Sequence, residues 1–119
     1  MEELEGLFVD SALRIKRAGF DGIEIHGAHG YLLAEFVSPL SNLRKDKYGG
    51  SFEKRLTLPR NLIRRVREHV GSDFVLGYRI SGDEHVAGGL TLEETKRLVP
   101  ILISEGLDFI HLSSDVWKP

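Results

Sequence analysis

The chain has 119 residues, a formal net charge of −2 and a pI of about 6.2, with 41% hydrophobic and 29% charged residues. This composition is that of one small globular domain and excludes a disordered chain, and the charge gives no general attraction to nucleic acid or to an anionic membrane. Cysteine is absent, which excludes disulfides, cysteine-ligated zinc and iron–sulfur clusters. We expect a cytoplasmic protein, because the acidic residues 1–5 lack the apolar region of a signal peptide and no apolar run approaches the ~20 residues of a membrane span.

The first predicted helix covers residues 3–18. Its apolar positions recur at helical spacing and are Leu4, Leu7, Phe8, Ala12 and Ile15. We expect Gly19 to end this helix, because glycine adopts the positive φ of a helix C-terminus without a side-chain clash. A short apolar strand is predicted next, at residues 22–26.

The pattern of helix, glycine, aspartate and strand occurs twice more. A second apolar stripe lies in residues 52–70, but Pro59 is compatible only with a first turn or a kink, so we expect the helix itself at 56–70. A strand at 74–79 follows it. A third helix is predicted at 91–105, opened by a capping box of Thr91 and Glu94, and a third strand at 108–112.

Helices that alternate with short, nearly all-apolar strands predict an α/β fold with a parallel sheet covered by helices. Periodicity alone allows either a barrel or an open doubly wound sheet. The links that lead into strands take only two or three residues, whereas those that leave strands are long, about 27–51 and 80–90. Because such loops carry the chemistry of α/β folds, we expect the functional residues just after Ile25, Arg79 and Leu112.

The loop after the first strand holds two imidazoles and a phenol, from His26, His29 and Tyr31. The two imidazoles could donate paired hydrogen bonds to one oxygen that gains negative charge in a transition state, and Tyr31 could supply a proton nearby. Two other interpretations stay open at this point. The histidines could be structural, or His26 could bind a metal together with Glu24, which shares its face of the strand.

Other charged residues give weaker signals. Arg79 ends an apolar strand, where it could be exposed at the rim or could hold an anion. No convergent partners are evident for three further histidines, which we interpret as structural: His69, His85 and His111. Four arginines of the second helix are expected on a solvated face: Arg60, Arg64, Arg65 and Arg67.

Several motifs together resemble the Old Yellow Enzyme family of NADH:flavin oxidoreductases. The match begins with AGFDGIEIHGAHGYLL at residues 18–33. It continues through FVSPLSN (36–42), Arg44, DKYGGS (46–51), RIS (79–81) and GGLT (88–91). The order and spacing agree over nearly the whole chain, so the resemblance is far more specific than any single motif.

The resemblance implies a fold and a role for each candidate residue. The family fold is a (β/α)8 TIM barrel that binds FMN. His26 and His29 resemble the pair that holds the carbonyl or nitro oxygen of the substrate, Tyr31 resembles the proton donor to its α carbon, and Arg79 resembles the arginine that contacts the FMN pyrimidine ring. In the family, a hydride passes from NAD(P)H through the flavin to the β carbon of an activated alkene.

Length is the main departure from the family pattern. A (β/α)8 barrel needs roughly 200 or more residues, and residues 1–119 resemble only its middle, as a partial barrel of about three strands and three helices. Two functions are therefore expected as alternatives. The chain is an FMN-dependent ene-reductase present as a partial barrel, with an activated alkene or nitro compound as substrate and no nucleic-acid, membrane or metal partner. Alternatively, it is a truncated, inactive fragment with a structural or self-association role, because a three-stranded sheet has two unpaired edges.

Overall fold

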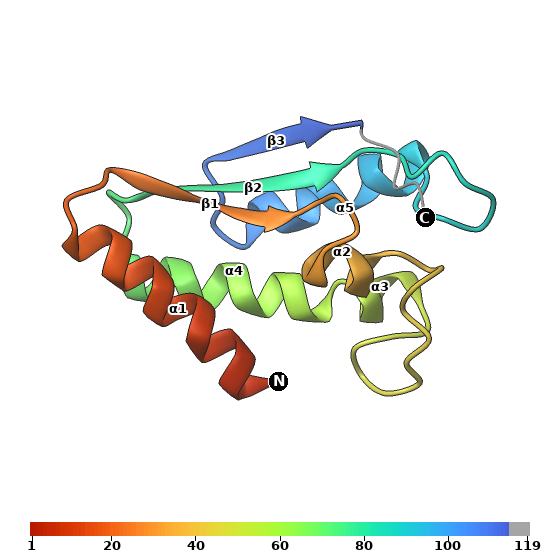
Figure 1. Ribbon diagram of the computed structural model, residues 1–119, viewed down its shortest axis with the longest axis horizontal. Coiled ribbons are helices and arrows are strands. Elements are labelled where there is room, and N and C mark those ends of the chain that lie inside the picture. The colour runs from red at the N-terminus through yellow and green to blue at the C-terminus, as the bar shows by residue number, and fades with distance from the viewer. Residues whose placement is uncertain (115–119) are drawn as a thin grey trace.

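In the part of the chain that the structure describes, three parallel strands form a single sheet with the helices on one of its sides (Figure 1). The computed structural model describes residues 1–114. The strands are β1 (Gly22–Gly27), β2 (Val75–Ser81) and β3 (Phe109–Ser113), and they lie in the order β1-β2-β3. The helices are α1 (Glu2–Arg17), α2 (Leu32–Val37), α3 (Phe52–Arg55), α4 (Thr57–Val70) and α5 (Leu92–Ser104). Both strand pairs are parallel, which confirms the predicted sheet.

The three long helices and the three strands all lie within two residues of their predicted bounds. Gly19 follows α1 with φ of 92°, as expected of a glycine at a helix C-terminus. The Thr91 hydroxyl accepts a hydrogen bond from the Glu94 amide (3.3 Å), which confirms the cap of α5. In the part of the chain that the structure describes, no helix has the length and apolar character needed to cross a membrane.

Of two short helices, α2 was not predicted from the sequence, and α3 lies in the apolar stripe at residues 52–70 but was not predicted as a separate helix. Six and four residues respectively are too few for a periodic apolar pattern to stand out. The Ser51 hydroxyl caps α3 by accepting a hydrogen bond from the Lys54 amide. The helix is interrupted at Leu56, and α4 begins at the next residue. Pro59 lies in the first turn of α4, which is where its missing N–H is tolerated.

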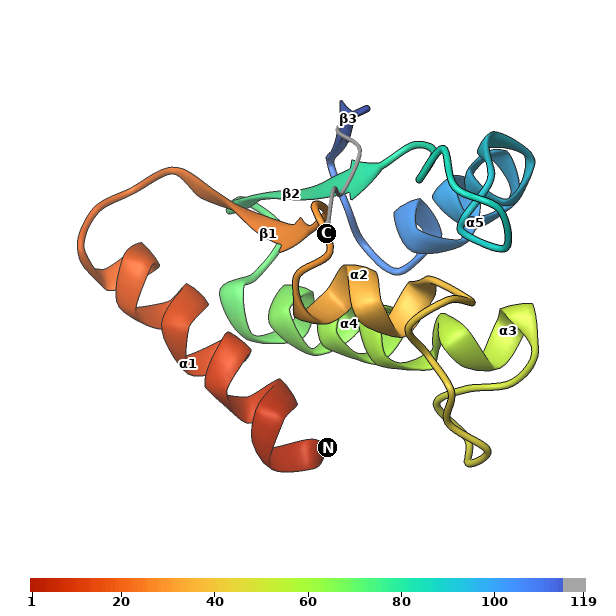
Figure 2. The ribbon, with the colours of Figure 1, turned by 45° about the vertical axis from the view of Figure 1, so that its right-hand side comes forward.

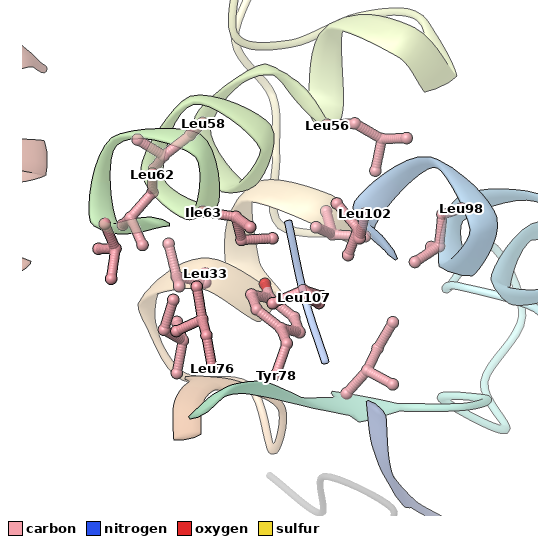
Figure 3. Close-up of a cluster of buried hydrophobic side chains, with 14 of the residues drawn as sticks. Leu33, Leu56, Leu58, Leu62, Ile63, Leu76, Tyr78, Leu98, Leu102 and Leu107 are labelled. Carbon is pink, nitrogen blue, oxygen red and sulfur yellow. The ribbon is translucent and has the colours of Figure 1, made fainter. Parts of the chain in front are cut away.

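The core lies between the sheet and helices α4 and α5 (Figure 3). Leu62 and Ile63 of α4 meet Leu102 of α5 and Tyr78 of β2, and all four side chains are fully buried. Because side chains alternate along a strand, the opposite face of the sheet carries a different set of residues. Within residues 1–114, Figure 2 shows no helix over that face, which leaves its side chains available to the site described below.

The arginines of α4 lie at the surface as expected, three of them with side chains 35–47% exposed, but all four are paired with carboxylates. Arg60 and Arg64 both bond the Glu105 carboxylate, at 2.7 and 2.8 Å. Arg65 bonds Glu5 of α1 at 2.9 Å, and Arg67 bonds Asp108, just before β3, at 2.6 Å. Sequence spacing shows which helix face these residues share, but their partners lie on other elements and depend on how the helices pack. These pairs fasten α4 to the elements on both sides of it.

Tyr78 gives a first prediction, on stability. Its hydroxyl is buried without a hydrogen-bond partner among residues 1–114, and burial raises the pKa of Tyr78, since a phenolate would be desolvated. An unsatisfied buried hydroxyl costs ~1–3 kcal/mol, so we expect Tyr78→Phe to leave the free energy of unfolding unchanged or to raise it by about 1 kcal/mol. Urea denaturation measures this, with Leu76→Ala as a control that loses about 2–5 kcal/mol. A clear loss in Tyr78→Phe would mean that the hydroxyl has a partner.

Candidate active site

A row of polar side chains crosses the open face of the sheet near its carboxyl end. His26 of β1 is in register with Arg79 of β2, and Arg79 is in register with His111 of β3. Register partners in a parallel sheet point to the same side, so these three side chains lie next to one another. The predicted placement of His26 and Arg79 at one end of the sheet is therefore confirmed.

The loop after β1 folds the other two predicted side chains back onto His26. His29 adopts the left-handed conformation, with φ of 60°, and the Tyr31 amide donates to the Ala28 carbonyl (3.3 Å) to close a turn. The ring centroid of His26 then lies 5.2 Å from that of His29 and 5.3 Å from that of Tyr31. The expected gathering of these side chains with Arg79 is confirmed as geometry.

Two serines that the sequence analysis did not single out hold His29 in this position. The His29 amide donates to Ser81 Oγ at 2.9 Å, and the ring atom Nε2 lies 2.7 Å from Ser113 Oγ. Ser81 and Ser113 are register partners at the last positions of β2 and β3. The available signal was a small hydroxyl residue directly at the carboxyl end of each apolar strand.

The electrostatic surroundings favour a neutral His26 ring. Desolvation lowers the pKa of His26 first, and His29 and Arg79 lower it further, because a positive charge on His26 would face two other groups that are or can become cationic. Glu24 opposes this shift. A neutral imidazole keeps one N–H, so His26 can donate a hydrogen bond near neutral pH without carrying a charge.

The titration of His26 is a second prediction. We expect its pKa, measured by NMR, below the ordinary value of ~6.5, with Arg79→Gln raising it and Glu24→Gln lowering it. Because the folded state binds this proton less readily than the unfolded state, His26 contributes a stability that falls as the pH drops through ~6.5 toward the lowered pKa. His26→Gln should flatten that part of the pH profile. A His26 pKa at or above the ordinary value would contradict the arrangement.

Arg79 offers a donor that the described residues leave unused. Its side chain is half-buried, and Nε is fully buried without a hydrogen-bond partner among residues 1–114. A buried donor without an acceptor is costly, and it suits a site that receives an anionic or carbonyl-bearing ligand. This atom lies on the strand next to His26, so such a ligand would border the histidine cluster.

His111 has a partner, which corrects the interpretation that it has none. Its Nδ1 lies 3.0 and 3.1 Å from the two carboxylate oxygens of Glu24. The two residues reach across β2, where the Phe109 ring occupies the space that a side chain at Gly77 would fill. Within residues 1–114, no group of three or more His, Cys, Asp or Glu side chains is placed to hold a metal ion.

A hollow of about 390 Å³ lies beside the histidine cluster, between α2 and the loop before α5. Its lining includes Gly30, Glu35, Leu40 and Val86. Glu84 closes one side by accepting from the Ser38 hydroxyl (2.7 Å) and from the Leu90 amide (2.5 Å). None of the four predicted site residues lines this hollow, so they form a separate group on the face of the sheet.

Comparison with protein families gives a match over nearly the whole chain. The model of the NADH:flavin oxidoreductase / NADH oxidase family matches residues 1–115. An NADH oxidase of Thermoanaerobacter brockii is 50% identical over 118 residues, which cover 99% of this chain and 18% of that protein. An NADPH dehydrogenase of Bacillus cytotoxicus is 45% identical over 113 residues, covering 94% and 32%. The chain thus spans less than a third of either relative.

Solved structures agree with the sequence matches. A histamine dehydrogenase from Rhizobium sp. superposes with a TM-score of 0.88 at 34% identity, over 98% of this chain and 17% of that one. Morphinone reductase in complex with tetrahydroNAD superposes with a TM-score of 0.81 at 30% identity, over 93% and 31%. The predicted partial (β/α)8 barrel is confirmed, because these similar proteins are TIM barrels of which the chain matches a small part.

Proposed function

Because the chain belongs to the NADH:flavin oxidoreductase / NADH oxidase family, we propose that it forms the substrate-activating part of a barrel that reduces activated alkenes. FMN and NAD(P)H are the cofactors of this family. One observation carries the proposal. Two imidazoles, a phenol and a guanidinium converge at the carboxyl end of one sheet.

The residues present fit a flavin at this end of the sheet. The pyrimidine side of the flavin carries carbonyl oxygens and gains negative charge on reduction, which a guanidinium stabilises. Arg79, with its buried Nε and no acceptor among the described residues, is the side chain that would hold it. When bound, FMN supplies the hydride that NAD(P)H provides.

His26 and His29 would bind the oxygen of the substrate. Their ring centroids lie 5.2 Å apart, close enough for one N–H from each ring to reach a single carbonyl or nitro oxygen. Such donors are strongest where charge develops, so they stabilise the transition state more than the ground state. Withdrawing electrons through this oxygen makes the β carbon of a conjugated alkene electrophilic. The lowered pKa of His26 favours the neutral ring, which still has one N–H to donate to this oxygen.

Tyr31 would supply the proton that completes the reduction. Its ring is 64% exposed and lies 5.3 Å from that of His26, so a molecule bound to the imidazoles can reach the phenol. A positioned phenol is a suitable general acid for a carbon that gains negative charge. Proton delivery to the α carbon is then the role that fits its place.

A second candidate function rests on the surfaces that the sheet leaves uncovered. Neither outer edge of the sheet, on β1 and on β3, is paired within residues 1–114, and Val75 and Phe109 are more than 40% exposed. Unpaired strand edges favour pairing with another chain, so the polypeptide would act as a self-associating fragment without catalysis. Colour separates the two functions in a completed barrel such as the chimera described next, because only the first function requires bound FMN.

A chimera tests the proposed function. The 113 residues of the Bacillus cytotoxicus NADPH dehydrogenase that align with this chain are replaced by their counterparts here. We expect a yellow protein that holds FMN and reduces 2-cyclohexenone with NADPH. The matched control carries His26→Ala and His29→Ala and should hold FMN but lose about 100-fold or more of its activity, as loss of oxyanion donors does. A chimera that holds FMN yet is no more active than this control would refute the proposal.

A further inference from the structure

A carboxylate lies within reach of Arg79 but binds a different residue. Glu24 of β1 is in register with Gly77 of β2, two residues before Arg79, and ordinary strand spacings place the Cα atoms of Glu24 and Arg79 about 8 Å apart on one face of the sheet. Two such long side chains can bridge that distance, as diagonal pairs in sheets do. Among residues 1–114, however, Arg79 forms no ion pair with Glu24 or with another carboxylate.

His111 of β3 holds the Glu24 carboxylate instead. Its Nδ1 lies 3.0 and 3.1 Å from the two carboxylate oxygens. An ionised carboxylate only accepts hydrogen bonds, so Nδ1 carries a hydrogen and donates it. Since His111 is in register with Arg79, the Glu24 side chain reaches past the strand of Arg79 to a donor on the far side of that strand. His111 and Arg79 are thus alternative partners of one carboxylate.

The guanidinium of Arg79 is left with a charge that no carboxylate of residues 1–114 neutralises. Its Nε is buried and has no hydrogen-bond partner among the described residues. A carboxylate binds a guanidinium through one or two strong, charge-assisted hydrogen bonds. Glu24 on Arg79 would therefore occupy the donors, and would neutralise the charge, that stabilise a reduced flavin.

We propose that His111 is a positioning residue for the flavin: it binds Glu24, keeps this carboxylate away from Arg79, and so leaves the guanidinium free for the pyrimidine side of FMN. The part that concerns FMN rests on the proposed function, whereas the competition for Glu24 does not. The proposal gives a role in the site to a histidine of β3 that the sequence alone marks as structural.

The competition for Glu24 can be measured in the 119-residue protein without flavin. The protein is labelled with ¹⁵N-arginine, and the Nε–H signal of Arg79 is assigned by its absence in Arg79→Gln. We expect His111→Ala to release Glu24 onto Arg79, which moves this signal downfield because the N–H then donates to a carboxylate. In the double variant His111→Ala/Glu24→Gln the signal should return to its original position, because the competing charge is gone.

Two variants control for the loss of a histidine. His111→Asn keeps an N–H donor near the position of Nδ1 and should leave the Arg79 signal in place, as should His69→Ala, which removes an exposed histidine of α4. A signal that stays in place in His111→Ala, or that moves equally in the double variant, would overturn the proposal. Should His111→Ala not fold, His111→Leu removes the donor but keeps more of the volume, and the same shift decides.

The same variants in the chimera measure the effect on the flavin. His111→Ala should weaken FMN binding about tenfold, the loss that one hydrogen bond to a charged group corresponds to, and the double variant should restore the affinity. An unchanged affinity in His111→Ala would overturn the inference even in an active chimera. A chimera that shows this pattern of affinities but reduces no alkene would contradict the proposed function and support the inference.

Discussion

In the active chimera, Tyr31→Phe should slow the reduction of the alkene by about 10²–10⁴-fold, the usual contribution of a general acid, and leave the reduction of the flavin by NADPH unchanged. The substitution removes one oxygen from an exposed ring beside His26 and retains the aromatic contact. Only the half-reaction that ends in protonation of carbon needs that oxygen. Stopped-flow absorbance of the flavin measures the two half-reactions separately.

Tyr48→Phe is the matched control for this experiment. Tyr48 is buried and lies in the loop before α3, outside the histidine cluster, so the same deletion of a phenolic oxygen should change neither half-reaction. Equal slowing of both half-reactions by Tyr31→Phe would remove Tyr31 from the role of proton donor. It would indicate that the phenol supports the site as a whole.

The placement of the predicted site could be derived from the sequence because it depends on few properties. Parallel strands have all their carboxyl ends at one edge of the sheet. The alternation of helices and strands along the chain predicts such a sheet, so His26 and Arg79 were expected at the same end of it. The long helices were predicted for a similar reason. α1 and α4, with 16 and 14 residues, repeat their apolar positions often enough to give a periodic signal.

The parts that the sequence did not predict depend on contacts between distant residues. The loop after β1 brings His29 onto Ser113 through the left-handed turn at His29, and Glu24 pairs with His111 across β2, beside the Phe109 ring that packs against Gly77. Neither contact leaves a local pattern along the chain. Both are fixed by strand register, which a single sequence specifies only through the packing of the whole sheet.

The isolated 119-residue chain, in contrast to the chimera, should bind FMN more weakly than micromolar and show no alkene reduction. FMN has a phosphate dianion and a large planar ring, and tight binding requires that both be held. In (β/α)8 barrels the phosphate is frequently held by the loops after strands seven and eight, whereas the residues described here provide three central strands.

The contact that remains is too weak to replace the phosphate site. One charged contact from Arg79 at an open sheet face contributes about 1 kcal/mol, far below the roughly 8 kcal/mol of a micromolar complex. Water also reaches the open face, where His26 is exposed, and a high local dielectric weakens hydrogen bonds to a developing oxyanion. Titration of the purified chain, followed by flavin fluorescence, measures the affinity, with Arg79→Gln as the variant that should abolish any residual binding and the chimera as the positive control. Stoichiometric micromolar binding by the monomer would contradict the prediction, whereas binding by an oligomer alone would indicate that copies of the chain pair their open edges and complete the flavin site together.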